Sequence, residues 1–429
     1  MLTRLTLLLY FLCTLAFAEQ SSPASVASST AQQLFSASQN DLLQIRVLLI
    51  NGRSQASIGS GFLIGTSNLA ITNFHVISQI AQEPETYFAE YKDTQGTSGK
   101  VELLAVDVRH DLAVVRIDRA GNDFFKLNNL PTLNQGEHLY SLGNPLDLGF
   151  TISEGTYNGI SHRGFSDQIM FTGPVNPGMS GGPNITSSGQ VSGINVAHRR
   201  DGELVSFLVP SLYAQLLFNS VKPESKAPTD FKPIIGKQLL EHQALMMDKL
   251  LESPLTLKQL GSYSVPVRES EQLRCWGNSD AKADKTYSTD NISCSMESAI
   301  FVSDELQTGF ISMHHQYIRS TKLNSLRFSA LMGKFFGNKV QGNTKDTTLV
   351  TPHCTEQFIH NKNYKGRAVL CIEAYQKYNG LYDFTLMTTS TDEPLMNLQS
   401  RLDLNGVSYE NGKKFVSLFL SQMDKEAIK

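Results

Sequence analysis

The sequence predicts an all-β barrel or sandwich over residues 40–220, followed by an α+β domain over residues 236–429. In the first part, short apolar runs alternate at close spacing with Gly, Asn and Pro, which is the pattern of short strands and turns. The second part mixes helical and strand-like periodicity. The 429 residues fit two or three domains, and the 41% hydrophobic share is enough to build their cores.

The charge balance argues against nucleic-acid or membrane-surface binding. Lys and Arg number 37 and Asp and Glu number 40, so the formal net charge is −3. Binding to phosphates or anionic lipids depends on an excess of positive charge. We therefore expect no nucleic-acid partner.

Residues 1–18 have the pattern of a secretory signal peptide. Arg4 precedes an apolar run from Leu5 to Leu15, and Ala16-Phe17-Ala18 supplies the small residues of a cleavage site. A membrane anchor is the alternative, but the run is shorter than the roughly 20 residues that span a bilayer. Lipidation at Cys13 is disfavoured by the large leucine before it. We expect an exported chain, periplasmic or secreted, with no membrane segment after cleavage.

Cleavage would also change the cysteine count. Of five cysteines, Cys13 would leave with the signal, and an even number in an exported chain favours disulfides. Three connectivities are open. Pairs close in sequence are preferred because each closes a loop of about 20 residues, for about 3 kcal/mol per bond in the chain-entropy model. The preferred pairs are Cys275–Cys294 and Cys354–Cys371.

Residues 19–39 are rich in Ser, Ala and Gln, which predicts a flexible leader. The domain that follows contains the expected strands. They include residues 45–50 before the turn Asn51-Gly52, then residues 60–65, 69–72, 101–106 and 112–117.

A linker and a mixed domain are expected after residue 220. Residues 221–235 contain three prolines, and residues 236–251 repeat Leu and Met at helical spacing. Later elements are a helix over 325–336, strands over 368–388 around Asn379-Gly380, and a closing helix over 412–423.

A glycine-rich motif around Ser180 is the first candidate for chemistry. Residues 178–182 are Gly-Met-Ser-Gly-Gly, followed by Pro183. A serine hydroxyl becomes nucleophilic when a base removes its proton, and the oxyanion formed on attack needs donors. Glycines allow a tight turn in which the N–H groups of Gly178 and Ser180 form such an oxyanion hole. A glycine-rich surface turn is the alternative, and an α/β-hydrolase elbow fits poorly because no βα alternation surrounds the motif.

A base and its orienting carboxylate are found upstream. His75 follows the apolar run 69–72, and Asp111 opens the apolar run 112–117. A buried aspartate can accept the Nδ1–H of a histidine, which fixes its tautomer and stabilises the imidazolium. Asp107 is a rival on the same segment. The order His75, Asp111, Ser180 is that of the chymotrypsin-type triad.

These segments resemble the trypsin-like serine protease domain of the HtrA/Deg family, also called protease Do, over about residues 42–218. The resemblance implies two six-stranded β-barrels with the active site in the cleft between them. It also implies cleavage of misfolded or exposed polypeptides in the bacterial envelope. Family members commonly assemble as trimers, so a homo-oligomer is among the expected partners. The matching segments are residues 59–64, 71–77, 110–117, 141–145, 175–183, 193–195 and 207–210.

Two positions depart from the family pattern. Met179 stands where the family more often has Asn and where digestive relatives have an Asp that pairs with a freed N-terminus. Met179 cannot make that ion pair, so the oxyanion loop must be ordered in another way. Thr172 stands where many members have Asp.

The specificity pocket should be lined by residues before Ser180 and by the strand after it. No carboxylate occurs there, so a Lys or Arg side chain would be left unpaired. We expect cleavage after small or medium apolar residues. The candidates are Gly173, Pro174, Val175, Ile194, Asn195 and Val196.

Residues 236–429 show no convincing PDZ carboxylate-binding loop, and their role is open. His314-His315, with His353 or His360, suggests a metal-binding site, but adjacent residues of a strand point to opposite faces, so both cannot easily serve one site. We expect no metal or cofactor. The sequence thus predicts an exported serine endopeptidase. The alternative is a weakly active or inactive protease fold that binds partners through its C-terminal domain.

Overall fold

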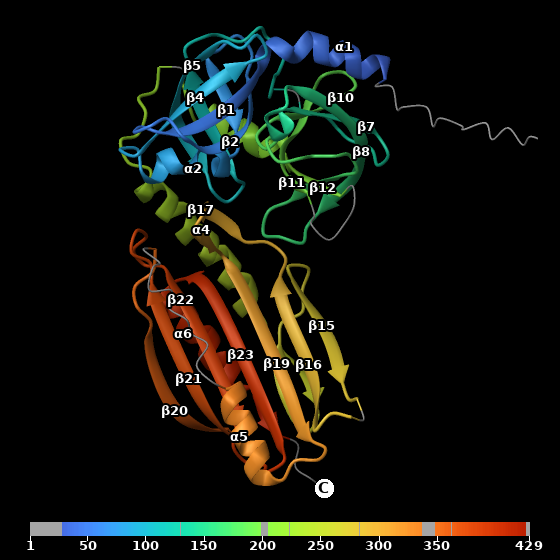
Figure 1. Cartoon of the computed structure of the whole chain (residues 1–429), viewed down its shortest axis with the longest axis vertical. Coiled ribbons are helices and arrows are strands. Elements are labelled where there is room, and N and C mark those ends of the chain that lie inside the picture. Colours follow the sequence, from blue (N-terminus) through green and yellow to red (C-terminus); the bar gives the residue numbers. More distant parts are fainter. Residues whose placement is uncertain are drawn as a thin grey trace, which may run out of the picture.

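The computed structural model describes residues 28–128, 130–198, 205–222, 224–282, 284–336, 348–361 and 363–425. Two closed β-barrels lie side by side at one end of the molecule, and a long antiparallel sheet forms the other end (Figure 1). This architecture confirms the predicted double barrel followed by a domain of sheets and helices. The predicted signal peptide, residues 1–18, lies outside the described residues.

The first barrel closes in the strand order β1-β2-β3-β6-β5-β4. Alternate residues of β1, Leu43, Ile45 and Val47, are fully buried in its interior, as the period of two along a strand requires. Helix α2 (Phe74–Gln82) begins directly after β3. The strands are β1 (Leu42–Leu49), β2 (Gln55–Leu63), β3 (Leu69–Thr72), β4 (Tyr87–Asp93), β5 (Ser98–Asp107) and β6 (Leu112–Ile117).

The second barrel closes in the order β10-β11-β12-β9-β8-β7, and helix α3 (Ser211–Asn219) follows its last strand. The loop that contains Ser180 joins β9 to β10. The strands are β7 (His138–Gly143), β8 (Thr151–Ser161), β9 (Gln168–Phe171), β10 (Pro183–Thr186), β11 (Val191–His198) and β12 (Ser206–Pro210).

The expected flexible leader over residues 19–39 is wrong for its last part, which forms helix α1 (Ser29–Ser38). The Ser28 side chain caps the helix by accepting the N–H of Ala31. Ala31 and Leu34, three residues apart, are buried in the core shared by the two barrels. Tertiary burial of this small apolar face outweighs a composition that resembles a linker.

Helix α4 (Lys232–Leu251) begins inside the segment expected to be a linker over 221–235. Pro233 lies in its first turn, where a missing N–H costs no helical hydrogen bond. Ile235 and Leu239 pack into the core of the first barrel, whereas Met246 and Met247 pack into the core of the second domain. The helix therefore connects two cores.

The C-terminal sheet has seven antiparallel strands in the order β15-β16-β19-β23-β22-β21-β20. Helix α6 (Tyr409–Ser421) buries Phe415 and Phe419 in the core on one face, and helix α5 (Ser325–Phe335) packs Phe328 on Ile318 of the other. The strands are β15 (Leu273–Asp280), β16 (Tyr287–Met296), β19 (Phe310–Ser320), β20 (His353–Asn361), β21 (Tyr364–Ala374), β22 (Tyr382–Ser390) and β23 (Met396–Val407), and a small sheet contains β13 (Thr256–Leu260), β14 (Tyr263–Val267) and β24 (Asp424–Lys425).

Both preferred disulfides, Cys275–Cys294 and Cys354–Cys371, are present. Each joins directly paired residues of neighbouring strands, β15 with β16 and β20 with β21. The short loops that these pairs close are antiparallel hairpins. Within the described residues, no helix is long and apolar enough to cross a membrane.

The hairpin of β17 (Ile300–Ser303) and β18 (Leu306–Thr308) lies between the sheet and the first barrel (Figure 1). Its buried residues Ile300, Val302 and Leu306 belong to the same apolar cluster as the interior of the first barrel. Tyr378 joins this cluster from the C-terminal domain, and its hydroxyl accepts a hydrogen bond from Gln82 of α2 at 2.6 Å. The two halves of the chain therefore share a core.

Candidate active site

His75 lies in the first turn of α2, immediately after β3. Its neighbours Phe74 and Val76 are fully buried and fix the helix on the barrel, whereas the His75 side chain remains 30% exposed. The imidazole is therefore held on a rigid element and presented to the space between the barrels.

Asp111 binds both the backbone and the ring of His75. One carboxylate oxygen accepts the N–H of His75 at 2.8 Å, and the other lies 2.6 Å from Nδ1. The Asp111 carbonyl accepts hydrogen bonds from the N–H of Phe74 and the side chain of Asn73. Asp111 also has a φ of +55°, an uncommon conformation for a residue with a side chain. The rival carboxylate, Asp107, pairs instead with His110 at 2.6 Å.

The pKa of His75 is raised above its ordinary value of 6.5. Burial of the ring acts in the opposite direction and lowers the pKa. The charge of Asp111, its hydrogen bond to Nδ1 and the charge of Asp304 together raise it by more. The ring is therefore a better proton acceptor than a free histidine.

The loop of Ser180 is packed against the segment that leads to His75. Gly181 has a φ of +85°, and a Cβ on it would lie 2.4 Å from the hydroxyl oxygen of Thr72 and 2.8 Å from the nitrogen of Asn73. The N–H of Ser60 donates to the carbonyl of Ser180 at 2.7 Å. Only a glycine permits this approach, so the motif packs the serine loop of the second barrel against the segment of the first barrel that leads to His75.

The Ser180 hydroxyl does not face the histidine in this conformation. Its Oγ donates a hydrogen bond of 2.9 Å to the carbonyl of Val196 on β11. Across the described part of the chain, no hydrogen bond joins Ser180 to His75. A hydrogen bond from this hydroxyl to His75 would require it to leave the Val196 carbonyl.

The N–H groups of Gly178 and Ser180 donate to no other residue that the structure describes. Gly178 has a φ of +94°, and a Cβ on it would lie 2.4 Å from the carbonyl oxygen of Asn144. Its own carbonyl accepts the Ser60 hydroxyl at 2.7 Å. The turn thus holds two amide donors beside the serine that remain free for a ligand oxygen.

Met179 orders this turn through apolar packing. The side chain is 1% exposed and lies in a cluster with Val175, Phe171 and Leu208. The sequence shows only that an ion pair is impossible at this position. The structure shows a buried methionine in its place.

The six candidate pocket residues occupy different environments. Val175, Ile194 and Asn195 are buried in the second barrel, and the Asn195 amide bonds to Ser141 and to the Leu142 carbonyl. The Gly173 carbonyl accepts the Ser206 hydroxyl, Pro174 is exposed, and Val196 lines an open cavity beside His75. Of the six side chains, Val196 is therefore the one that the structure places beside the candidate base.

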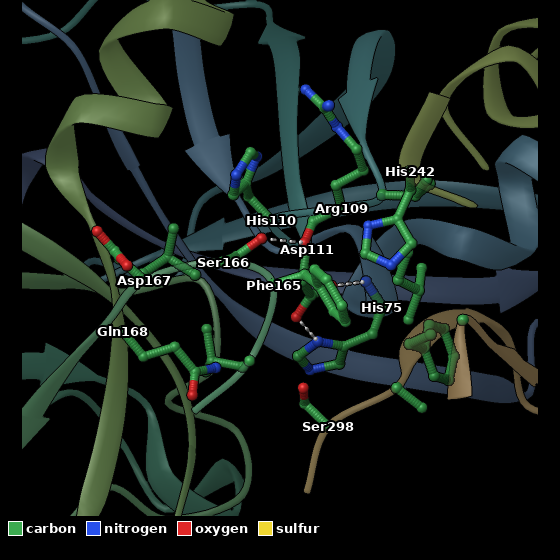
Figure 2. A pocket seen from close by; sticks show the side chains of 18 of the residues that line it. His75, Arg109, His110, Asp111, Phe165, Ser166, Asp167, Gln168, His242 and Ser298 are labelled. Carbon is green, nitrogen blue, oxygen red and sulfur yellow. Dashed lines mark hydrogen bonds and ion pairs between the residues drawn. The ribbon is translucent and has the colours of Figure 1, made fainter. Parts of the chain in front are cut away.

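This cavity, of about 460 Å³, contains residues that the sequence did not indicate (Figure 2). Figure 2 shows Phe165 and His242 beside the His75–Asp111 pair, with Ser298 of the C-terminal domain next to the imidazole. Phe301 packs its ring edge-on to His75, with centroids 6.0 Å apart. More than 200 residues separate Phe301 from His75, so no local pattern connects them.

The histidines of the C-terminal sheet do not gather around one point. His315 is buried, bonded to Ser400 and to the Pro266 carbonyl, whereas the neighbouring His314 faces the other side of the sheet and contacts Ser293. Among the described residues, no three His, Cys, Asp or Glu side chains are placed to hold a metal ion.

Two closed six-stranded barrels, with a histidine and an aspartate from one and a serine loop from the other, form the architecture of trypsin-like serine peptidases. Residues 59–194 match the family model described as "Trypsin-like peptidase domain". The N-terminal half of the chain is similar in sequence to proteases of the HtrA/Deg type.

Two relatives illustrate this similarity in sequence. A Synechocystis protein named "Putative serine protease HhoB" is 28% identical over 210 residues, which cover 47% of this chain and 46% of the relative. A Pseudomonas fluorescens protein named "Probable periplasmic serine endoprotease DegP-like" is 30% identical over 194 residues, covering 44% and 40%. The crystal structure of the serine endoprotease from Yersinia pestis is 23% identical with a TM-score of 0.39, covering 46% and 67%. The chain spans less than half the length of either curated relative.

Proposed function

We propose that this protein is an exported serine endopeptidase that cleaves unfolded or exposed polypeptides through an acyl-enzyme. Ser180 attacks the scissile carbonyl, and His75 accepts its proton and returns it to the leaving amine. Asp111 orients His75 and stabilises the imidazolium. The N–H groups of Gly178 and Ser180 bind the oxyanion. The proposal depends on one observation: Asp111 and His75 are joined by two hydrogen bonds, next to a glycine-rich turn that contains a serine.

The resting position of the serine hydroxyl is compatible with this mechanism. Rotation of Ser180 exchanges its hydrogen bond to the Val196 carbonyl for one to His75. One neutral hydrogen bond contributes about 0.5–1.5 kcal/mol net. Its loss therefore slows the reaction by roughly tenfold at most, which is small beside the acceleration that peptidases provide.

The same hydroxyl position favours a second candidate function. A protein whose serine stays bonded to Val196 would bind polypeptides with weak or absent turnover, and its C-terminal domain would recognise a partner. The complete set of His75, Asp111 and Ser180 with its glycines weighs against this function, because a drifted pseudoenzyme commonly loses one of them.

The proposal also covers the residue after which the chain cleaves and the place where it acts. The six residues expected to line the P1 pocket include no carboxylate for a basic P1 side chain, so we propose cleavage after small or medium apolar residues. We also propose a periplasmic or extracellular location, which the expected signal peptide and the two disulfides support. Cleavage mainly after Lys or Arg in a peptide library would contradict the P1 assignment.

Labelling of the full chain with a fluorophosphonate probe separates the two functions. We expect the native protein to be labelled and to hydrolyse an unfolded protein substrate. Ser180→Ala should lose both properties and keep the native unfolding transition. A native protein that is not labelled, or a Ser180→Ala variant that retains hydrolysis, would contradict the triad assignment.

A further inference from the structure

The cavity beside His75 is walled by both halves of the chain. From the barrels it is lined by His75, Val196 and Phe165, and from the C-terminal half by His242, Met296 and Phe301. Its volume of about 460 Å³ lies within the range of roughly 300–1,000 Å³ that is usual for ligand pockets. The C-terminal half thus contributes a wall directly beside the candidate base.

The cavity adjoins the residue that holds the Ser180 hydroxyl. The Val196 carbonyl, which accepts the Ser180 hydroxyl at 2.9 Å, belongs to a residue of its lining. We place the strand of Val196 beside the P1 residue of the substrate. Successive side chains of an extended peptide point to opposite faces, so the residue before P1 points away from the P1 wall. We place this cavity, which adjoins His75, on that side.

Arg109, Asp167 and Gln168 also line the cavity, but several of its walls are apolar. Phe301 presents its ring edge-on to His75 and also contacts Phe74, with centroids 6.5 Å apart. Phe165 lies on the other side, with its ring edge-on to His242 at 5.6 Å. Met296 is 4% exposed and Ile300 is 7% exposed. Both side chains therefore give the cavity an apolar wall that is largely shielded from solvent.

His242 adds a buried polar atom without a hydrogen-bond partner to these walls. The residue is 8% exposed, and its Nε2 has no hydrogen-bond partner among the described residues. Gly309 leaves space beside this atom, because a Cβ there would lie 3.1 Å from Nε2. Burial, with the nearby charges of Arg109 and His110, lowers the pKa of His242 to about 4, so the ring is neutral at pH 7. A buried polar atom without a partner is costly unless a ligand satisfies it.

We propose that this cavity is a substrate subsite built jointly by the two halves. It takes an aromatic or branched aliphatic side chain from the residue that precedes P1 in the polypeptide, and His242 forms one hydrogen bond with the peptide beside that side chain. The inference rests on the proposed function, because it assumes that the polypeptide is held at Ser180. The C-terminal domain is then part of the substrate cleft and determines specificity there.

The test uses the full chain and peptides with a constant small apolar P1 residue and Gly, Leu or Phe before it. We expect kcat/KM to be about 10- to 100-fold higher for Leu or Phe than for Gly, as for burial of such side chains. Ala299→Trp, an exposed position on the cavity rim, should reduce this preference to less than threefold. Leu326→Trp, 82% exposed on α5, adds bulk elsewhere and should leave the preference unchanged.

The His242 contact has its own variant. His242→Phe keeps a ring of similar size and removes Nε2, so kcat/KM for the Leu peptide should fall about five- to tenfold while the preference over Gly remains. A preference that survives Ala299→Trp unchanged, or no preference in the native chain, would overturn the subsite.

Binding measurements separate this inference from the proposed function. In the Ser180→Ala background, the Leu and Phe peptides should bind more tightly than the Gly peptide, and Ala299→Trp should remove the difference. If native protein hydrolyses nothing, the proposed function fails. The cavity still stands if this binding difference is found and falls if it is not.

Discussion

Gln238 of α4 is predicted to support the loop that carries Asp111. Its side-chain amide donates to the Val106 carbonyl at 2.7 Å and accepts the N–H of Val108 at 2.9 Å. Both valines are 2% exposed, and Val108 lies three positions before Asp111. A single side chain from the C-terminal half therefore pairs with two backbone groups at the entrance of this loop.

Replacement by alanine removes both hydrogen bonds. A buried N–H that loses its partner costs about 1–3 kcal/mol, and the Val106 carbonyl also loses its side-chain donor. We expect Gln238→Ala to reduce the free energy of unfolding by about 2–3 kcal/mol. Because the loop positions Asp111 on His75, we also expect kcat to fall by about 10- to 100-fold with a smaller change in KM.

Urea unfolding and steady-state peptide hydrolysis measure these two effects. Lys237→Ala is the matched control, because Lys237 lies on the same helix with its side chain 79% exposed. Exposed substitutions of this kind usually change stability by less than about 0.5 kcal/mol. If Gln238→Ala resembled Lys237→Ala in both assays, the positioning role would be refuted. A loss of stability with kcat unchanged would restrict Gln238 to a structural role.

Two further predictions concern the base and the serine turn. Activity requires a neutral His75, whose pKa is raised, so kcat/KM should fall as the pH drops through a value above 6.5. Asp304→Asn should move this acidic limb of the pH profile to lower pH, and the control Glu305→Gln should not. An acidic limb that does not move in Asp304→Asn would contradict a contribution from the β17–β18 hairpin. Met179→Asp buries an unpaired charge at a site that is 1% exposed. This variant should lose fluorophosphonate labelling and about 3–5 kcal/mol of stability. The control Met179→Leu should lose less than about 1.5 kcal/mol. Labelling of Met179→Asp at the native rate would show that apolar packing does not order the turn.

Local patterns in the sequence were sufficient to predict most strands of the first barrel and to select His75, Asp111 and Ser180 as candidates. Each of these residues lies next to an apolar run or within a glycine-rich turn, so its setting can be recognised from its neighbours. The same local signals predicted both disulfides, because each pair closes a hairpin. The choice of Asp111 over Asp107 also agrees with the hydrogen bonds in the structure.

Contacts between distant segments could not be predicted in this way. Nothing near Phe301 or His242 indicates that they border His75, because their positions depend on how two domains pack. Val175 and Ile194 were expected to line a pocket, but their side chains are buried in the barrel cores. Helix α1 could not be predicted for a related reason, because its small apolar face is stabilised only by packing against barrel strands that come later in the sequence.

The shared core links the completion of the first barrel to the order of synthesis. The ribosome releases the strands of this barrel within the first 117 residues, but Tyr375, Tyr378 and Leu381 pack into the same apolar cluster. Until these residues emerge, part of that surface has no protein cover. A nascent chain of the N-terminal half alone therefore exposes apolar area, and these three residues arrive some 260 residues after the barrel's last strand.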